Sequence, residues 1–193
     1  MNLKANTKAN RTKSRSDMSR IITETERLII REFNLNDAAA VLHFNAPEEV
    51  NRYTGDAGMC ESLQDAIAII RDIWLVEYDK FGYGRWAVVL KETGKVIGFC
   101  GFKNESRIGA VDIGYRFHPE HWGKGYATES NMACVEYARQ EMELDRVVGD
   151  AAAENRASIN VLLKLGMSFD KQYREDQFTV NRYQMFLKSA GGN

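Results

Sequence analysis

The sequence lacks the features that mark membrane, secreted and fibrous proteins. Among its 193 residues there are only two prolines, and charged residues interrupt every apolar run well before the roughly 20 residues of a membrane span. No apolar segment follows the basic start, so we predict no secretory signal. The three cysteines, Cys60, Cys100 and Cys134, show neither a disulfide framework nor a metal-ligand spacing. These absences favour a cytoplasmic protein with reduced thiols.

The composition that remains is typical of an ordinary globular domain, with 44% hydrophobic and 27% charged residues. Charge is unevenly distributed, however. Residues 1–20 contain six basic side chains and one acidic side chain, a net charge of +5, so a total of −1 leaves −6 for the remainder. We predict a disordered basic tail over residues 1–20 and one domain over residues 21–190. The acidic domain argues against nucleic acid as a partner and suits a cationic amine substrate.

Hydrophobic periodicity and turn residues predict one α/β domain with a mixed sheet and the order β-α-α-β-β-β-α-β-α-β-β. Turns at 92–94 and 104–107 separate three successive strands, which we therefore expect to pair antiparallel. Ser62 with Asp65 resembles a capping box, and Asn155 is a candidate N-cap for the last helix. The expected strands are 27–33, 85–90, 96–103, 110–117, 146–152, 169–173 and 180–187, and the expected helices are 34–44, 62–78, 127–142 and 155–165.

Residues 118–129 read HPEHWGKGYATE and connect a predicted strand to a predicted helix. Gly123 and Gly125 lack a Cβ, so a ligand can approach the backbone closely there. The first turn of the helix adds unpaired N–H groups and the positive end of the helix dipole, which bind phosphate oxygens. The segment fails as a P-loop because Lys124 stands between the glycines, and as a dinucleotide fingerprint because Thr128 replaces the third glycine. A glycine turn that merely starts a helix is the alternative.

The same loop resembles the pyrophosphate loop of the GNAT superfamily of N-acyltransferases, whose pattern is Q/R-x-x-G-x-G/A. Trp122, Gly125 and Ala127 fall on this pattern, and Trp122 departs from the usual first residue. The segment WGKGYATE at 122–129 is similar to the corresponding segment in one branch of the superfamily, the ribosomal-protein-alanine N-acetyltransferases, which acetylate ribosomal-protein N-termini. ETERLIIRE at 24–32 resembles the first strand of that branch, and NRASINVLLKLGM at 155–167 resembles one of its helices.

This resemblance, which covers roughly residues 22–188, implies an acetyl-CoA-dependent N-acetyltransferase with a GNAT-like fold and a splayed central sheet. Backbone N–H groups of the loop would hold the pyrophosphate, and the pantetheine arm would run where the fourth and fifth predicted strands part. Lys124, Arg156 and Lys164 are candidates for the 3′-phosphate, or plain surface cations. The cofactor-binding residues that the resemblance implies are Tyr115, Arg116, Phe117, Trp122, Gly123, Lys124, Gly125, Tyr126, Ala127, Thr128, Asn155 and Ser158.

For catalysis the resemblance implies direct acetyl transfer with no covalent enzyme intermediate. Many relatives have a tyrosine as general acid where this sequence has Leu162, so the hydroxyl of Ser158 is the nearest candidate to stabilise the leaving thiolate. Asp112 lies where some relatives place a glutamate base, although it can equally be a strand carboxylate that faces solvent. Glu154 is a weaker candidate, and water can also carry the proton. Asn155 is a pantetheine contact, a plain N-cap, or both.

The acceptor is predicted to be a primary amine, most favourably the N-terminal α-amine of a protein. Losing a proton at pH 7 costs a lysine amine about 4.6 kcal/mol but an α-amine only about 1 kcal/mol. A small amine such as a polyamine, an amino sugar or an antibiotic is the alternative within the class, and a non-catalytic acyl-CoA sensor is the alternative outside it. We predict no nucleic-acid or membrane partner, and the oligomeric state, monomer or homodimer, stays open.

The irregular segment 46–60 is predicted to line the acceptor side, with Arg52, Tyr53 and Asp56 as candidate contacts. The three histidines suggest no metal triad, because no two of them are spaced as a pair on one helix face, and we therefore predict no metal. The aromatic side chains expected in the core rather than in a site are Trp74, Tyr78 and Trp86.

Overall fold

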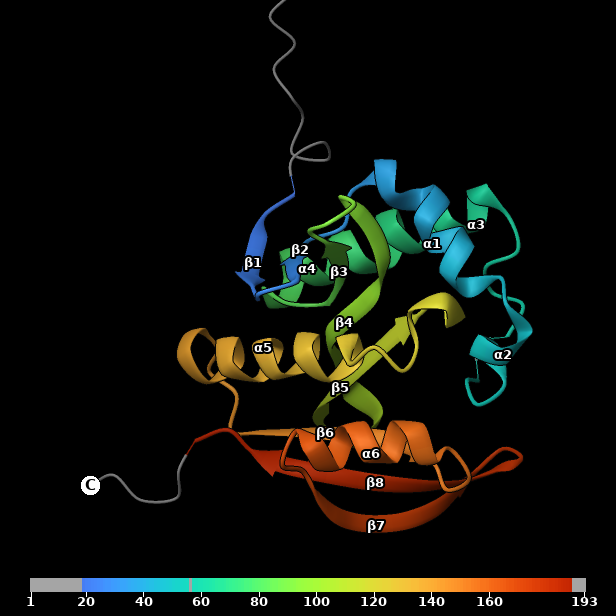
Figure 1. The fold of residues 1–193 in the computed structure, drawn as a ribbon. Coiled ribbons are helices and arrows are strands. Elements are labelled where there is room, and N and C mark those ends of the chain that lie inside the picture. The colour runs from blue at the N-terminus through green and yellow to red at the C-terminus, as the bar shows by residue number, and fades with distance from the viewer. Residues whose placement is uncertain (1–18, 56, 189–193) are drawn as a thin grey trace, which may run out of the picture.

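The computed structural model describes residues 19–55 and 57–188 (Figure 1). Within these ranges the chain forms one eight-stranded sheet in the order β1-β2-β3-β4-β5-β6-β8-β7. Neighbouring strands are antiparallel except β5 and β6, which are parallel. The strands are β1 (Ile21–Glu24), β2 (Leu28–Arg31), β3 (Arg85–Leu90), β4 (Lys95–Glu105), β5 (Ala110–Phe117), β6 (Arg146–Ala152), β7 (Ser168–Glu175) and β8 (Phe178–Phe186).

Several of the helical segments begin at recognisable capping residues. Asn34 forms a capping box with Asp37, and Ser62 forms the predicted one with Asp65. None of the helices in the described part of the chain has the length and apolarity needed to cross a bilayer. The α-helices are α1 (Ala38–Asn45), α2 (Glu48–Asn51), α3 (Leu63–Ala68), α4 (Leu75–Phe81), α5 (Tyr126–Glu141) and α6 (Arg156–Lys164), joined by a π-helical segment η3 (Ile69–Trp74) and the 3-10 turns η2 (Leu35–Asp37), η4 (Ser106–Ile108) and η5 (Pro119–His121).

The predicted α/β order is confirmed, with three additions. The short helix α2 lies within the segment 46–60, which is predicted to be irregular. A short strand, β1, precedes the predicted first strand and pairs with it antiparallel. The segment η3 joins α3 to α4 inside the single helix that the periodicity predicts. Ser19 and Arg20, which fall in the predicted tail, hydrogen-bond to Arg31 of β2 and Tyr137 of α5. Residues 1–18, which make up the rest of that tail, lie outside the described residues.

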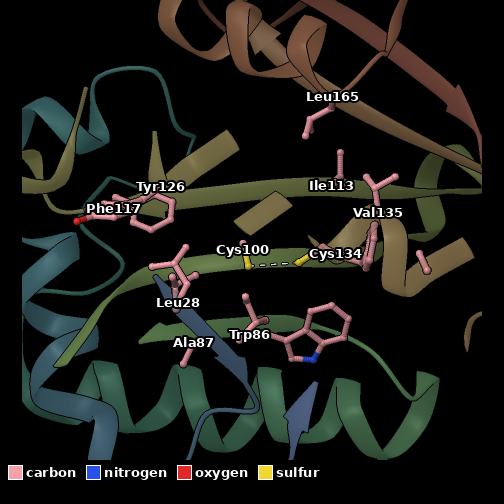
Figure 2. Close-up of a cluster of buried hydrophobic side chains, with 14 of the residues drawn as sticks. Leu28, Trp86, Ala87, Cys100, Ile113, Phe117, Tyr126, Cys134, Val135 and Leu165 are labelled. Atoms are coloured by element: carbon pink, nitrogen blue, oxygen red, sulfur yellow. Dashed lines mark hydrogen bonds between the residues drawn. The ribbon is translucent and has the colours of Figure 1, made fainter. Parts of the chain in front are cut away.

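The hydrophobic core covers both faces of the central strands. On one face Cys100 of β4 meets Cys134 of α5, with the two buried sulfurs 3.3 Å apart (Figure 2). On the other face Phe99 contacts Phe44 of α1 and Trp74 of η3. Because successive strand residues point to opposite faces, α5 covers one side of the sheet, and α1 and η3 cover the other. The predicted core aromatics Trp74, Tyr78 and Trp86 are all buried.

The parallel neighbours β5 and β6 pair only at their beginnings. Their register joins Val111 to Val147 and Asp112 to Val148, and no further pair follows along these two fully described strands. Residues 113–117 stay paired with β4 but have no partner on β6. The two strands therefore diverge, as predicted, into what we call the β5–β6 fork (Figure 1). Backbone N–H and C=O groups on the open side of residues 113–117 require another partner, and a ligand can supply it.

Candidate active site

Two side chains meet at the β5–β6 fork. Tyr115 extends from β5, and its hydroxyl donates to Oγ of Ser158 on α6, 3.1 Å away. Asn155 caps α6 by accepting from the backbone N–H of Ser158 at 3.0 Å, which fixes the position of the serine. Burial raises the pKa of the Tyr115 phenol, and the hydrogen bond to Ser158 opposes that rise. The phenol is therefore protonated at neutral pH, and the Ser158 hydroxyl keeps its own proton for a further acceptor.

A glycine turn beyond the end of β5 leads into α5. Gly123 and Gly125 have φ angles of 71° and 83°, in the left-handed region that favours glycine, and Gly125 is the N-cap of α5. A Cβ built at Gly123 would meet no heavy atom within 4 Å. The indole N–H of Trp122 donates to the carbonyl of Phe117 at 2.8 Å, which ties the turn to β5. Because the first N–H groups of α5 have no partner inside the helix, they are oriented to receive an anion.

Arg27 supports this turn from the connection between β1 and β2. Its Nη1 donates to the carbonyl of Lys124 at 3.0 Å, and its Nε donates to Oε2 of Glu129 at 2.7 Å. The Thr25 hydroxyl also donates to Glu129, and the guanidinium lies 4.5 Å from the ring centre of Tyr126. Burial raises the pKa of Glu129, but the hydrogen bonds from Thr25 and Arg27 outweigh it and leave the pKa below its ordinary value. One arginine therefore joins the turn to the sheet edge.

Asp112 lies at the base of the fork, on the sheet face opposite to Tyr115, because the two are three positions apart on β5 and successive residues alternate between the faces. Its Oδ2 accepts from Nη2 of Arg85 at 2.5 Å, and Arg85 also donates to the carbonyl of Gly101. The Asp112 side chain is 22% exposed, so it does not face open solvent. Burial raises the pKa of this carboxyl above its ordinary value, although the charge and hydrogen bond of Arg85 oppose the rise.

A cavity of about 290 Å³ lies on the α1 side of the sheet. Its lining comes from α1, α2, residues 58–61, η3 and Arg116 of β5. The Arg116 guanidinium hydrogen-bonds to Asn45 of α1 and lies over the Phe99 ring. Arg116 therefore turns its side chain toward the cavity, and only its backbone lies along the fork.

Several predicted residues lie apart from these features. Arg52 and Tyr53 stack on one another, 5.3 Å from guanidinium to ring centre, and do not line the cavity. Asp56 lies outside the described residues. The side chains of the remaining phosphate and base candidates, Lys124, Arg156, Lys164 and Glu154, are all exposed.

Three features of the site are not predicted by the sequence. Arg27 falls within the noted segment ETERLIIRE, but its contact with the turn is 97 residues away along the chain. Arg85 opens a predicted strand, and no local pattern marks it as the partner of Asp112. Tyr115 is predicted as a neighbour of pantetheine, whereas the structure adds a hydroxyl directed at Ser158.

Together, the diverging strands and the glycine turn would suit a long, thin ligand that carries phosphate. The open space at Gly123 and the donors at the start of α5 fit such a ligand. This combination is typical of enzymes that use coenzyme A.

Comparison with known proteins agrees with this class. The sequence matches the acetyltransferase (GNAT) domain family over residues 27–168. The uncharacterized N-acetyltransferase YoaA of Bacillus subtilis is 34% identical over 155 residues, which cover 80% of this chain and 86% of the relative. The ribosomal α-N-protein acetyltransferase RimL, solved with coenzyme A, aligns with a TM-score of 0.75 at 16% identity, covering 86% of this chain and 98% of its own. The microcin self-immunity acetyltransferase MccE, solved with acetyl-CoA and AMP, aligns with a TM-score of 0.73 at 14% identity, covering 84% and 93%.

The chain belongs to the GNAT family of N-acetyltransferases. It is therefore a transferase, and two of its structural neighbours, RimL and MccE, are solved in complex with coenzyme A and acetyl-CoA.

Proposed function

We propose that this enzyme transfers the acetyl group of acetyl-CoA directly to a primary amine, most favourably the N-terminal α-amine of a protein. The observation that carries the proposal is the alignment of three features along β5. The glycine turn follows its end, residues 113–117, which pair with β4 but not with β6, form its open side, and Tyr115 meets Ser158 beside them. The pyrophosphate belongs at the turn, the pantetheine arm along the fork, and the thioester near Ser158.

Ser158 stabilises the leaving group in this arrangement. The amine nitrogen attacks the thioester carbon, the C–S bond breaks, and the sulfur leaves with the electron pair. The Ser158 hydroxyl accepts from Tyr115, so its own proton is directed outward and can be donated to the sulfur. Tyr115 then returns a proton to Ser158 and regains its own proton from solvent. The phenol thus replaces the general acid that many relatives carry at the position of Leu162.

Asp112 is the candidate acceptor for the proton that leaves the amine. Its raised pKa makes it a better base than an ordinary aspartate, but Arg85 holds one of its oxygens. Such a base supplies only part of the roughly 4.6 kcal/mol that a lysine amine requires at pH 7. An α-amine needs only about 1 kcal/mol, so this site suits an α-amine better.

The cavity beside Arg116 supports the same acceptor. Its volume of about 290 Å³ is at the low end of the range for ligand pockets, so it suits the first side chain of a peptide better than a large antibiotic. RimL, which acts on a ribosomal protein α-amine, shares the fold at 16% identity. A small amine of similar volume is the second candidate, and MccE shares the fold to a similar extent.

Thiol release from acetyl-CoA, followed with a thiol-reactive dye, tests the proposal with a matched pair of peptides. One peptide has a free N-terminus and no lysine, and the other has a blocked N-terminus and one lysine. Spermidine and an amino sugar complete the panel. We expect turnover on the first peptide, with the product mass increased by one acetyl group on the α-nitrogen.

Each of the other possible results of this assay would overturn a specific part of the proposal. Turnover only on the blocked peptide or the small amines would overturn the α-amine assignment but keep the acetyl transfer. Tight binding of acetyl-CoA with no turnover on any amine would overturn the enzyme function and favour a sensor. Absence of binding would overturn the assignment of the fork and turn.

A further inference from the structure

All three histidines of the chain lie around one carboxylate. The sequence contains only His43, His118 and His121, and it predicts no metal site because none of them pair on one helix face. In the structure His43 comes from α1, while His118 and His121 flank the carboxylate Glu120 on η5. His43 and His118 are 75 residues apart in the sequence, but in the folded chain their rings stack with centres 4.1 Å apart.

The nitrogen atoms converge on one oxygen. Oε1 of Glu120 lies 3.1 Å from Nε2 of His121, 3.5 Å from Nδ1 of His118 and 3.8 Å from Nε2 of His43. The donor atoms of His43, His118 and Glu120 all lie within 4.8 Å of one another. The two longer distances exceed those of good hydrogen bonds. They are close to the roughly 3.3–3.5 Å that separates two ligands of a tetrahedral ion with bonds of about 2.0–2.2 Å.

His118 offers an unprotonated Nδ1 as a ligand. This atom accepts a long bond, 3.4 Å, from the backbone N–H of Glu120 and lies 3.5 Å from the Glu120 carboxylate oxygen. Because Nδ1 has a single lone pair, a metal ion bound there would replace the long bond. The same ion would then be held by the carboxylate and by the nitrogen of His43 as well.

We propose that His43, His118 and Glu120 form a binding site for one divalent transition-metal ion of the zinc class. Two imidazoles, a carboxylate and one water molecule would match the ligands and the coordination number that Zn²⁺ prefers. The nearly parallel rings of His43 and His118, 13° apart, require one of them to turn so that both lone pairs meet the ion. His43 can do this because its side chain is 61% exposed.

The site lies between two elements of the fold, η5 and α1. η5 lies directly before the glycine turn, and α1 lines the cavity beside Arg116. An ion held by both elements would join α1 to the segment that leads into the turn. Binding of the ion is independent of acetyl transfer, because it involves only the ion and its three protein ligands.

Calorimetric titration of the chelator-treated, full-length chain with ZnCl₂ tests the proposal. We expect one ion per chain, and a dissociation constant at least about tenfold weaker in His43→Gln and in Glu120→Gln, which remove one ligand each. Both side chains are exposed, so these variants should fold, and their melting temperatures without metal serve as the check. Glu49→Gln, an exposed carboxylate on α2, is the matched control and should bind as the wild type does.

Co²⁺ gives a second readout that identifies the ligands. A tetrahedral nitrogen and oxygen site should give visible absorption bands without thiolate-to-cobalt charge transfer, and Cys60→Ser should leave the spectrum unchanged. Three outcomes would overturn the proposal. They are the absence of saturable ZnCl₂ binding, unchanged affinity in both ligand variants, and a charge-transfer band that disappears in Cys60→Ser.

Discussion

Replacing Arg27 with methionine should loosen the glycine turn without altering any residue of the turn. The substitution removes the hydrogen bond to the Lys124 carbonyl and the ion pair with Glu129, but keeps an unbranched stem over the Tyr126 ring. The Arg27 side chain is 42% exposed, so solvent screens the ion pair and limits it to at most about 1 kcal/mol. The bond to the carbonyl contributes about 1 kcal/mol. The free energy of unfolding should therefore fall by roughly 1–2 kcal/mol.

The affinity for coenzyme A should fall as well, because the Lys124 peptide would then be ordered only when the ligand binds. Ordering one residue costs about 1–2 kcal/mol, which corresponds to roughly five- to thirtyfold weaker binding. Calorimetric titration with coenzyme A measures this change. Arg27→Lys keeps the charge but lacks the guanidinium group that reaches two acceptors, so it should recover only part of the affinity. Arg71→Met, which removes another arginine from an ion pair with Asp72, is the matched control and should bind normally.

The pH dependence of stability provides an independent readout. Burial raises the pKa of Glu129, but the hydrogen bonds from Thr25 and Arg27 lower it below its ordinary value. A carboxyl with a lowered pKa contributes stability above its unfolded pKa and loses it as the pH falls through the folded pKa. The stability difference between the wild type and Arg27→Met should therefore be largest near neutral pH and shrink below about pH 4. A coenzyme A affinity within about twofold of wild type would refute the role of Arg27 in the turn.

Four further substitutions test the rest of the site. Gly125→Glu places a side chain at a φ of 83° and a negative charge beside the expected pyrophosphate. Acetyl-CoA binding, measured by calorimetry, should therefore be lost in a folded protein. Unchanged affinity would show that the turn is not the phosphate site. Ser158→Ala and Tyr115→Phe should each lower kcat about tenfold or more with little change in acetyl-CoA affinity, because their contacts strengthen in the transition state; a change in KM alone would assign them to binding. Asp112→Asn should lower the rate by about 10²–10⁴-fold near neutral pH, with a loss that shrinks as the pH approaches the pKa of the amine; a pH-independent loss would mark Asp112 as structural.

The local parts of the fold could be predicted because their causes lie close together in the sequence. The strands β3, β5 and β6 begin and end at the predicted residues, since alternation of apolar side chains and flanking turns define them. The caps at Ser62 and Asn155 were also predictable, because the capping side chain and the N–H that it accepts from lie three residues apart. The strand β1 was missed because its four residues, IITE, are too few to show a period.

The supporting contacts of the site could not be predicted because they join residues that are distant in the chain. Arg85 meets Asp112 because β3, β4 and β5 lie side by side in register, and no sequence pattern encodes that register. The approach of His43 to His118 depends on how α1 packs on the sheet. The sequence shows which residue types are present, whereas the order of the strands and the packing of the helices determine which of them come into contact.

The replacement of the missing tyrosine follows from the packing of α6. Leu162 is 2% exposed and lies against β6, where a Cβ built on Gly149 would come within 2.7 Å of its side chain. That position fills the core, so the proposed proton donor comes from β5 instead. Tyr115 and Asp112 are three residues apart on this strand, an odd spacing that places their side chains on opposite faces. The proposed proton donor for the departing sulfur and the proposed proton acceptor for the attacking amine would therefore come from the same strand, one from each face of the sheet.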